Sequence, residues 1–348
     1  MLDRHISGAI LRGNENRLLG RPFGAAIAVV CLVILAFSSI LVGGRVIAPA
    51  TVVDAFLAYD PQSLEHVIIR DYRLPRTLLA LLCGAGFGVS GALFQAVSRN
   101  PLADPGMLGV NAGAAFFVTL AVGLFGWQSI NAYIWASFTG AILVTSAVYI
   151  LGASRRDGVT PVRLVLAGVA ISAILGGIGS SITFLNPQAF DSMRMWSIGS
   201  VAGRDISVVT AVAPFIAAGL CLALFAARSL NAVALGEDLA KSLGTSVLSA
   251  RLLAIVAITL LAGASTAAAG PIAFVGLMVP HMVRWFIGPD QRWIIALTMV
   301  CAPILLLVAD IAGRLVLYPG ELETGIVTAF IGGPVLILLV RRMKASGL

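Results

Sequence analysis

Long stretches without Asp, Glu, Lys or Arg constrain this sequence more than any other feature. The longest covers 50 residues, Pro105–Ser154, and another covers 32 residues, Leu252–Val283. About 20 apolar residues are enough for a helix to cross the hydrocarbon core of a bilayer. Within that core every backbone polar group needs a partner in the chain, so a spanning segment forms a helix or part of a closed barrel. Stretches of this length predict an all-α, polytopic membrane protein.

Composition excludes the other broad classes of protein. Of 348 residues, 59% are hydrophobic and 11% are charged, whereas a soluble domain is about half apolar and about a quarter charged. A soluble fold of this chain would lack the polar surface to cover its core. The four cysteines stand alone in apolar stretches and form no C-x-x-C pair, which argues against a zinc or redox site. We therefore expect no metal site.

Ten membrane spans account for the uncharged stretches. The longest stretch is divided at 126–131, where turn-forming residues gather, and the 32-residue stretch is divided between Gly263 and Pro271. The predicted spans are Pro22–Gly44, Thr77–Ser98, two within Pro105–Ser154, Leu164–Phe190, Ile206–Ala227, two within Leu252–Val283, Trp293–Ala309 and Thr324–Val340.

The basic residues indicate the orientation of these spans. If residues 1–21 are cytoplasmic, ten spans place both termini in the cytoplasm. The inner segments then hold 16 of the 23 Lys and Arg residues, and the outer segments hold 7. Membrane proteins concentrate Lys and Arg in cytoplasmic segments. The net charge of +7 therefore follows from membrane topology, and a nucleic-acid partner is not expected.

No catalytic constellation is present in the sequence. There is no G-x-x-x-x-G-K-[ST] phosphate loop, no H-E-x-x-H and no G-x-S-x-G. Ion-coupled carriers usually hold ionisable groups deep within their spans. Here Asp310 and Arg314 are the main exception, and their i, i+4 spacing allows them to pair along one helix face. An external energy source, such as a partner ATPase, is favoured over an ion-coupled carrier that acts alone.

Two segments between spans have unusual patterns. In 231–247, Leu235, Leu239 and Leu243 fall on one helical face, which predicts a short amphipathic helix. Such a helix either lies on the membrane surface or docks on a partner, and periodicity does not distinguish these. The outer segment Arg70–Arg76 holds three arginines on the side that should be poor in them. This pattern indicates an acidic partner or an anionic ligand, or arginines that snorkel to the interface.

An ordered series of motifs gives the chain a family resemblance. In sequence order the motifs are Arg73-Leu74-Pro75-Arg76, Arg99-Asn100-Pro101-Leu102, Arg163–Gly168, Leu235-Gly236-Glu237, Gly270–Leu277, Ala309-Asp310 and Gly332-Gly333-Pro334. With this series the chain resembles the permease subunit of bacterial ABC importers for ferric siderophores, haem and vitamin B12, and it is most similar to the ferric enterobactin type. The resemblance implies a type II importer architecture and a single transmembrane permease domain over residues 1–348.

The resemblance also implies roles for particular residues. Arg73, Arg76 and Arg314 would face the periplasm and meet acidic residues of a binding protein. The gate positions are Asn100 and Leu102 in one loop and Thr160 and Pro161 in another; the vitamin B12 branch has a small polar residue at the position of Pro161. The segment 231–247 would form the coupling helices that contact the ATPase, through Leu235, Gly236, Glu237, Asp238, Leu239, Lys241, Ser242, Leu243 and Gly244.

The implied assembly contains a second permease (a paralogue or an identical copy), two ATPase subunits and a periplasmic substrate-binding protein in a bacterial inner membrane. ATP and Mg²⁺ would bind to the ATPase subunits, and this chain would hold no cofactor. The expected substrate is a ferric siderophore, of the catecholate type. A haem or vitamin B12 permease is the alternative, and an ion-coupled secondary transporter is a more distant one.

Overall fold

The computed structural model describes residues 2–44, 47–127, 129–153 and 160–346. Met1 of the predicted cytoplasmic N-terminus, and the loop residues Arg155 and Arg156 counted as inner cations, lie outside the described residues. The described residues form helices joined by short connections and contain no strand. In order, its elements are α1 (Leu2–Leu41), α2 (Pro49–Leu57), α3 (Leu64–Val67), η1 (Ile68–Arg73), α4 (Leu74–Ser98), η2 (Pro105–Leu108), α5 (Val110–Gly123), α6 (Ile130–Ala153), α7 (Pro161–Leu185), α8 (Pro187–Ile198), α9 (Ile206–Ala234), α10 (Glu237–Ser242), α11 (Val247–Ala269), α12 (Val275–Ile287), α13 (Gln291–Val316) and α14 (Thr324–Ser346).

The predicted all-helical membrane fold is confirmed. Seven helices in the described residues are long and apolar enough to cross a bilayer, and three further apolar helices are shorter, at Val110–Gly123, Val275–Ile287 and Thr324–Leu338. Each predicted span corresponds to one of these helices: α1, α4, α5, α6, α7, α9, α11, α12, α13 and α14.

Several predicted span ends are wrong: α9 continues to Ala234 and α13 to Val316, beyond the predicted Ala227 and Ala309, and one span ends early. The span predicted to end at Phe190 stops at Leu185, because Asn186 begins a new helix, α8. The Asn186 side chain accepts hydrogen bonds from the backbone N–H groups of Gln188 and Ala189, and Pro187 occupies the first position of α8. An N-cap asparagine followed by proline is a strong helix start. Charge counting missed it because no charged residue lies at this break.

The predicted division of the Leu252–Val283 stretch is confirmed. The helix α11 ends at Ala269, and Gly270 follows with φ +73. A Cβ atom at Gly270 would lie 2.4 Å from the carbonyl oxygen of Trp196, so a larger residue has neither the backbone conformation nor the space. The chain then crosses to α12, which begins at Val275.

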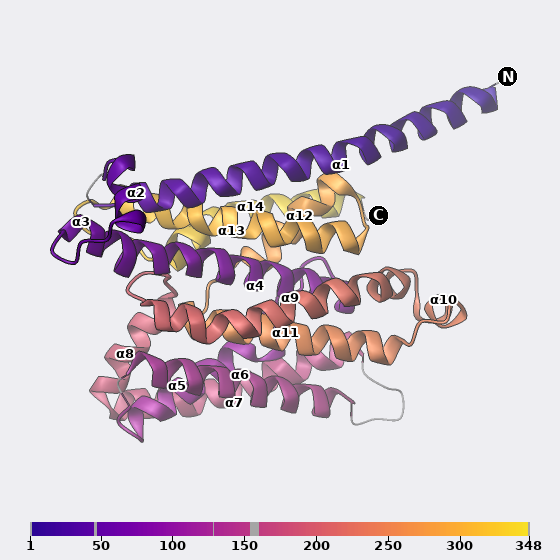
Figure 1. The fold of residues 1–348 in the computed structure, drawn as a ribbon. Helices are drawn as coiled ribbons and strands as arrows, with labels where there is room; N and C mark the ends of the chain where they lie inside the picture. The colour runs from indigo at the N-terminus through magenta and orange to yellow at the C-terminus, as the bar shows by residue number, and fades with distance from the viewer. Residues whose placement is uncertain (1, 45–46, 128, 154–159, 347–348) are drawn as a thin grey trace.

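The helix α4 occupies the centre of the bundle (Figure 1) and packs on α13, α11, α12 and α9. In the most apolar 18-residue stretch of this helix, 83% of the residues are buried. Small residues allow the backbone of α4 to approach the backbones of its neighbouring helices closely. A Cβ atom at Gly91 would lie 1.8 Å from the carbonyl oxygen of Gly276 in α12, so only glycine fits between these two backbones.

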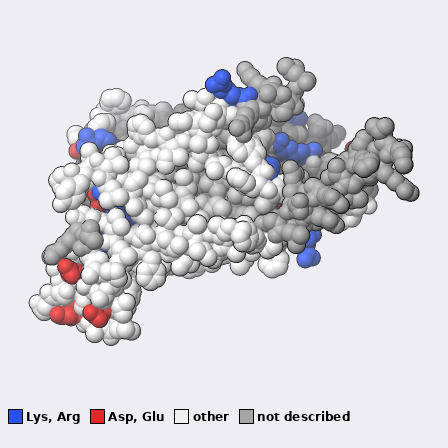
Figure 2. All heavy atoms as spheres, turned by 90° about the horizontal axis from the view of Figure 1, so that it is seen from above, with Lys and Arg blue, Asp and Glu red and all other residues white. Residues whose placement is uncertain are grey.

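The two ends of the bundle differ. The N-terminal end of α1, the C-terminal end of α14 and the connection α10 lie at one end, whereas α2, α3 and α8 lie at the other (Figure 1). We call these the α10 end and the α8 end. In Figure 2 the charged side chains gather towards the two ends, and the surface between them is almost free of charge. This uncharged band is the surface that a bilayer would cover.

Candidate functional site

At the α8 end of the bundle, Arg76 of α4 meets the Asp310 and Arg314 side chains of α13, which are 234 or more positions away in sequence. Asp310 of α13 is fully buried, and its carboxylate accepts hydrogen bonds from Arg76 Nε at 3.0 Å (Oδ1) and from Arg314 Nε at 3.1 Å (Oδ2). Arg314 Nη2 also donates to Asp310, and the Thr324 hydroxyl donates to Oδ1 at 3.1 Å. The pair predicted between Asp310 and Arg314 is therefore present. A buried carboxylate needs such partners because its desolvation is costly.

Arginines of this region also hold the C-terminal end of α1. Arg73 Nη1 donates to the carbonyl oxygens of Ile40 and Leu41 at 2.7 and 2.8 Å. Arg314 Nη1 donates to those of Ser39 and Val42 at 2.8 and 2.9 Å. The last carbonyls of a helix lack partners within the helix and carry partial negative charge, so cations stabilise them.

The structure thus brings together the three arginines that were predicted to dock a binding protein. Their side chains are not equally exposed. Arg73 and Arg314 are 6% and 3% exposed. Arg76 is the most accessible of them, with its side chain 12% exposed, and its Nη1 lies 2.6 Å from Glu321 Oε2. The Glu321 side chain is 42% exposed. We call Arg73, Arg76, Asp310, Arg314 and Glu321 the arginine cluster. Nothing in the sequence pointed to Glu321, which pairs across 245 positions.

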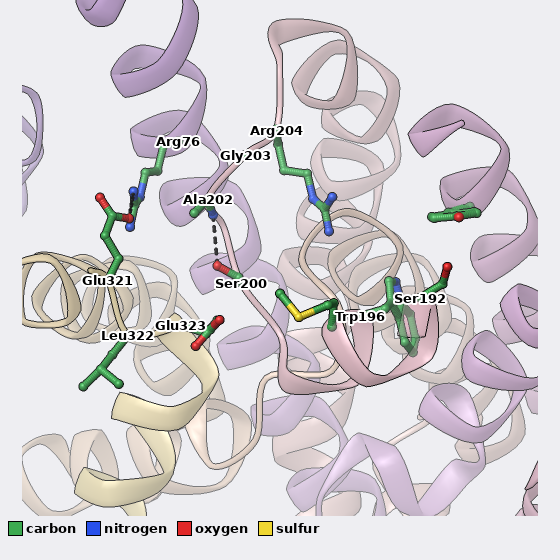
Figure 3. A pocket seen from close by; sticks show the side chains of 12 residues that line it. Arg76, Ser192, Trp196, Ser200, Ala202, Gly203, Arg204, Glu321, Leu322 and Glu323 are labelled. Carbon is green, nitrogen blue, oxygen red and sulfur yellow. Dashed lines mark hydrogen bonds and ion pairs between the residues drawn. The ribbon is translucent and has the colours of Figure 1, made fainter. Parts of the chain in front are cut away.

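A cavity of about 490 Å³ adjoins the arginine cluster (Figure 3). Arg76 and Glu321 form one wall, and Arg204 and Trp196 lie across from them. Arg204 Nε donates to the carbonyl oxygen of Ala268 at 3.0 Å, and burial lowers the pKa of its guanidinium. The full lining is Arg76, Tyr133, Ser192, Met195, Trp196, Ser200, Ala202, Gly203, Arg204, Glu321, Leu322 and Glu323.

At the other end, the predicted coupling segment forms a short exposed helix. Leu235, Leu239 and Leu243 are 64%, 48% and 61% exposed, so the predicted apolar stripe does not pack on this chain. Asp238, Lys241, Ser242 and Gly244 are exposed as well, while Ala240 is buried against Val233, Val247 and Ala250. The predicted helix is shorter than expected: φ is +123 at Gly236 and +76 at Gly244, and these glycines bound α10.

A short ion pair fixes α10 to the next helix. Glu237 Oε1 lies 2.6 Å from Arg251 Nη2 of α11. The pKa of the Glu237 carboxyl lies below its ordinary value, mainly because the carboxylate accepts this hydrogen bond from Arg251. Arg251 is among the residues that sequence analysis missed, because the pairing depends on the reversal of the chain between α10 and α11.

The predicted gate positions lie in two segments. Asn100 is exposed and Leu102 is half-buried in the loop after α4, where the Asn100 side chain accepts a hydrogen bond from Leu102 N at 2.9 Å. Thr160 occupies the N-cap position of α7 without a side-chain capping hydrogen bond, and Pro161 is the first residue of the helix. The helix α7 packs on η2, which belongs to the loop that carries Asn100 and Leu102. This contact lies within α7 at Gly168, where a Cβ atom would be 1.9 Å from the carbonyl oxygen of Met107, and not at Thr160 or Pro161.

The helix α7 presents an open face, since only 17% of the residues in its most apolar 18-residue stretch are buried. Exposed residues that are small or aromatic recur there at helical spacing: Ala170, Ala173, Gly177, Ser180 and Phe184. No group of three or more His, Cys, Asp and Glu side chains suited to a metal occurs in the part of the chain that the structure describes.

Comparison with known proteins identifies the family. The FecCD transport family matches residues 31–342. The chain belongs to the FecCD transport family. The ferric enterobactin transport system permease protein FepD of Escherichia coli (strain K12) is 46% identical over 317 residues, which cover 91% of this chain and 94% of that protein. The iron(3+)-hydroxamate import system permease protein FhuB of Bacillus subtilis (strain 168) is 42% identical over 335 residues, or 95% and 87% of the two chains.

A solved structure shows the same fold. It is an inward-facing conformation of a metal-chelate type ABC transporter, with a TM-score of 0.81, 27% sequence identity and coverage of 92% of this chain and 99% of that chain. This FecCD chain is therefore an ABC importer permease, a multi-pass protein of the inner membrane and a transport component rather than an enzyme. Permeases of this kind work with ATPase and binding-protein partners.

Proposed function

We propose that this permease imports a ferric siderophore of the catecholate type. The supporting observation is the 46% identity to the ferric enterobactin permease FepD over nearly the full length of both chains. The proposed assembly has two permeases, two ATPase subunits that hold ATP and Mg²⁺, and one periplasmic binding protein. This chain contributes the path and the coupling and holds no cofactor.

The proposed orientation places the α8 end in the periplasm and the α10 end in the cytoplasm. The excess of cations in the segments at the α10 end supports this assignment. The binding protein then meets the arginine cluster, where Arg76 is the most accessible of the three predicted docking arginines. An acidic side chain of the binding protein would compete with Glu321 for Arg76 Nη1. Arg73 and Arg314 act chiefly by fixing α1, α4 and α13 around this contact.

At the cytoplasmic end, the exposed leucines of the coupling segment provide the contact with the ATPase. Leu235, Leu239 and Leu243 form an apolar surface flanked by Asp238 and Lys241. Leucine side chains exposed to this degree on a polar end of the molecule favour a protein partner over a free aqueous surface. Asn100, Leu102, Thr160 and Pro161 act as gate residues near the same end, and the open face of α7 lines the path against the second permease.

Uptake by a strain that lacks this chain tests the proposal. The panel contains ⁵⁵Fe-labelled ferric enterobactin, a ferric hydroxamate, haem and labelled cobalamin. Loss of ferric enterobactin uptake alone, restored by the gene, is the expected result. Loss of ferric hydroxamate uptake alone, which the similarity to FhuB would favour, would overturn the catecholate assignment while keeping the importer. Retention of uptake for all four would overturn the assignment of any of these four substrates to this permease.

A further inference from the structure

Arg99 has a backbone conformation that a side-chain-bearing residue rarely adopts. It follows the last residue of α4 and has φ +51 and ψ 30, in the left-handed region. Helices often end with a residue in this region, and that residue is usually glycine because a Cβ atom is disfavoured there. Residues held in such conformations are retained where the surrounding structure stabilises them, often at functional positions.

The side chain of Arg99 joins two parts of the molecule that the proposed function treats separately. Arg99 Nη2 donates to the carbonyl oxygen of Val233 at 2.7 Å. Val233 lies in the last turn of α9, directly before the coupling segment, and its oxygen also accepts from Gly236 N at 3.2 Å. A cation at the C-terminal end of a helix is favourable, because the last carbonyls carry partial negative charge.

The coupling segment is fixed to its other neighbours as well. The Asn231 side chain donates to Asp290 Oδ1 at 2.8 Å and accepts from Gln291 N at 2.7 Å, which ties α9 to the start of α13. The Glu237–Arg251 pair ties α10 to α11. These contacts tie the end of α9 and α10 to α11 and α13, and Arg99 ties the same end of α9 to the loop after α4.

The loop after Arg99 is held by its own hydrogen bonds. Asn100 Oδ1 accepts from Leu102 N at 2.9 Å, and the Asn100 carbonyl accepts from Ala103 N at 3.1 Å. Leu102 therefore lies in a hydrogen-bonded turn that directly follows Arg99.

We propose that Arg99 is a positioning residue that transmits movement of α10 to the gate loop, through its hydrogen bond to the Val233 carbonyl. The inference rests on the proposed function, since it requires that an ATPase moves α10 and that Asn100 and Leu102 form a gate. Without the Arg99 side chain, the ATPase still hydrolyses ATP, but the gate loop no longer changes its position in response.

The test measures gate movement in the assembled transporter. The permease, with alanine at Cys31, Cys83, Cys221 and Cys301 and with Leu102→Cys, is reconstituted with its ATPase in proteoliposomes. The rate of maleimide labelling at position 102 is measured without nucleotide, with ATP and Mg²⁺, and with ATP, Mg²⁺ and vanadate. We expect nucleotide to change the labelling rate in this parent protein. In Arg99→Gly we expect that nucleotide-dependent change to be lost while ATP hydrolysis continues.

Glycine is the informative substitution because it relieves the left-handed backbone and removes the hydrogen bond at once. If Arg99 had only a structural role, Arg99→Gly would change the unfolding temperature and leave the nucleotide-dependent change in labelling rate intact. We expect the unfolding temperature of Arg99→Gly to stay at or above that of the parent. Arg99→Lys, which keeps a charged donor, should retain part of the labelling change. Arg228→Gln removes an exposed cation of α9 and should retain all of it.

The outcomes separate this inference from the proposed function. If the parent labels at a nucleotide-dependent rate and Arg99→Gly does so equally, Arg99 does not transmit the movement. If the parent itself shows no nucleotide dependence, the gate assignment of Leu102 is wrong and the role of Arg99 is overturned with it. Uptake by the unmodified complex is measured in parallel and tests the importer itself.

Discussion

Arg76 of α4 and Asp310 of α13 are 234 positions apart, and Arg76 Nε lies 3.0 and 3.1 Å from the two oxygens of the Asp310 carboxylate. This contact joins the central helix of the bundle to the helix on which it packs most extensively. It also places Arg76 next to Glu321 at the surface. One arginine thus takes part in an internal ion pair and in the surface proposed to meet the binding protein.

Loss of the Asp310 carboxylate should destabilise the protein strongly. In Asp310→Ala, Arg76 and Arg314 lose their buried counter-ion, and removal of one partner from a buried ion pair costs about 3–5 kcal/mol. Thermal unfolding of the purified complex measures the effect. Asp191→Ala is the matched control, because its pair with Arg194 is exposed, with a 3.9 Å separation, and should change stability by less than about 1 kcal/mol. Equal unfolding temperatures for the two variants would contradict the structural role of Asp310.

Removal of Glu321 should strengthen docking of the binding protein. Glu321→Ala frees Arg76 Nη1 from its partner in this chain, so an incoming acidic side chain has no competitor. Binding of the loaded binding protein to the complex in lipid nanodiscs is measured at low and high salt, because exposed ionic contacts weaken as salt rises. We expect tighter binding at low salt. Unchanged or weaker binding would argue that Arg76 does not meet the binding protein.

Reversal of the Arg76 charge gives the opposite expectation. Arg76→Glu should weaken docking, but it also disturbs Asp310, so its unfolding temperature must be measured beside its affinity. Arg70→Glu is a useful control, because Arg70 lies outside the arginine cluster, over the ring of Tyr59 at 4.5 Å. Weaker docking in Arg76→Glu but not in Arg70→Glu, at equal amounts of folded complex, is the expected result.

A charge on the apolar stripe of the coupling segment should release the ATPase. Leu239 is 48% exposed, so Leu239→Asp should change the stability of the isolated permease by no more than about 0.5 kcal/mol. Co-purification of the ATPase with tagged permease measures the interaction, and we expect it to fall. Leu57→Asp, in the 82% exposed position at the end of α2, serves as the control. The coupling assignment fails if Leu239→Asp retains the ATPase as well as Leu57→Asp does.

The Glu237–Arg251 pair should give stability a component that depends on pH. The pKa of the Glu237 carboxyl is lowered in the folded chain, so its contribution is present above the unfolded value of about 4.3 and is lost as pH falls through the folded pKa. Glu237→Gln should therefore lower the unfolding temperature at pH 7 and have a smaller effect as pH falls below about 4. An effect that stays constant across this range would show that the ionised pair does not stabilise α10.

Much of the architecture could be predicted from local sequence patterns. Uncharged stretches located ten apolar helices, and Gly270 marked the break between α11 and α12. The leucine spacing marked the coupling segment and the stripe that stays exposed. These features depend on the hydrophobicity and backbone freedom of neighbouring residues, which the sequence displays directly. The end of α7 was missed because a side-chain cap at Asn186, rather than a charge, terminates it.

The sequence by itself determined the class of protein and the approximate place of its spans, because the bilayer imposes length and polarity on each segment independently of the others. Its ordered motifs determined the family. The tertiary structure decided which charges meet. Glu321 with Arg76 and Arg99 with the Val233 carbonyl are pairings between residues 245 and 134 positions apart, and Arg251 with Glu237 is a pairing across a reversal of the chain. Such contacts depend on how helices pack and where connections reverse, and no periodicity in the sequence records them.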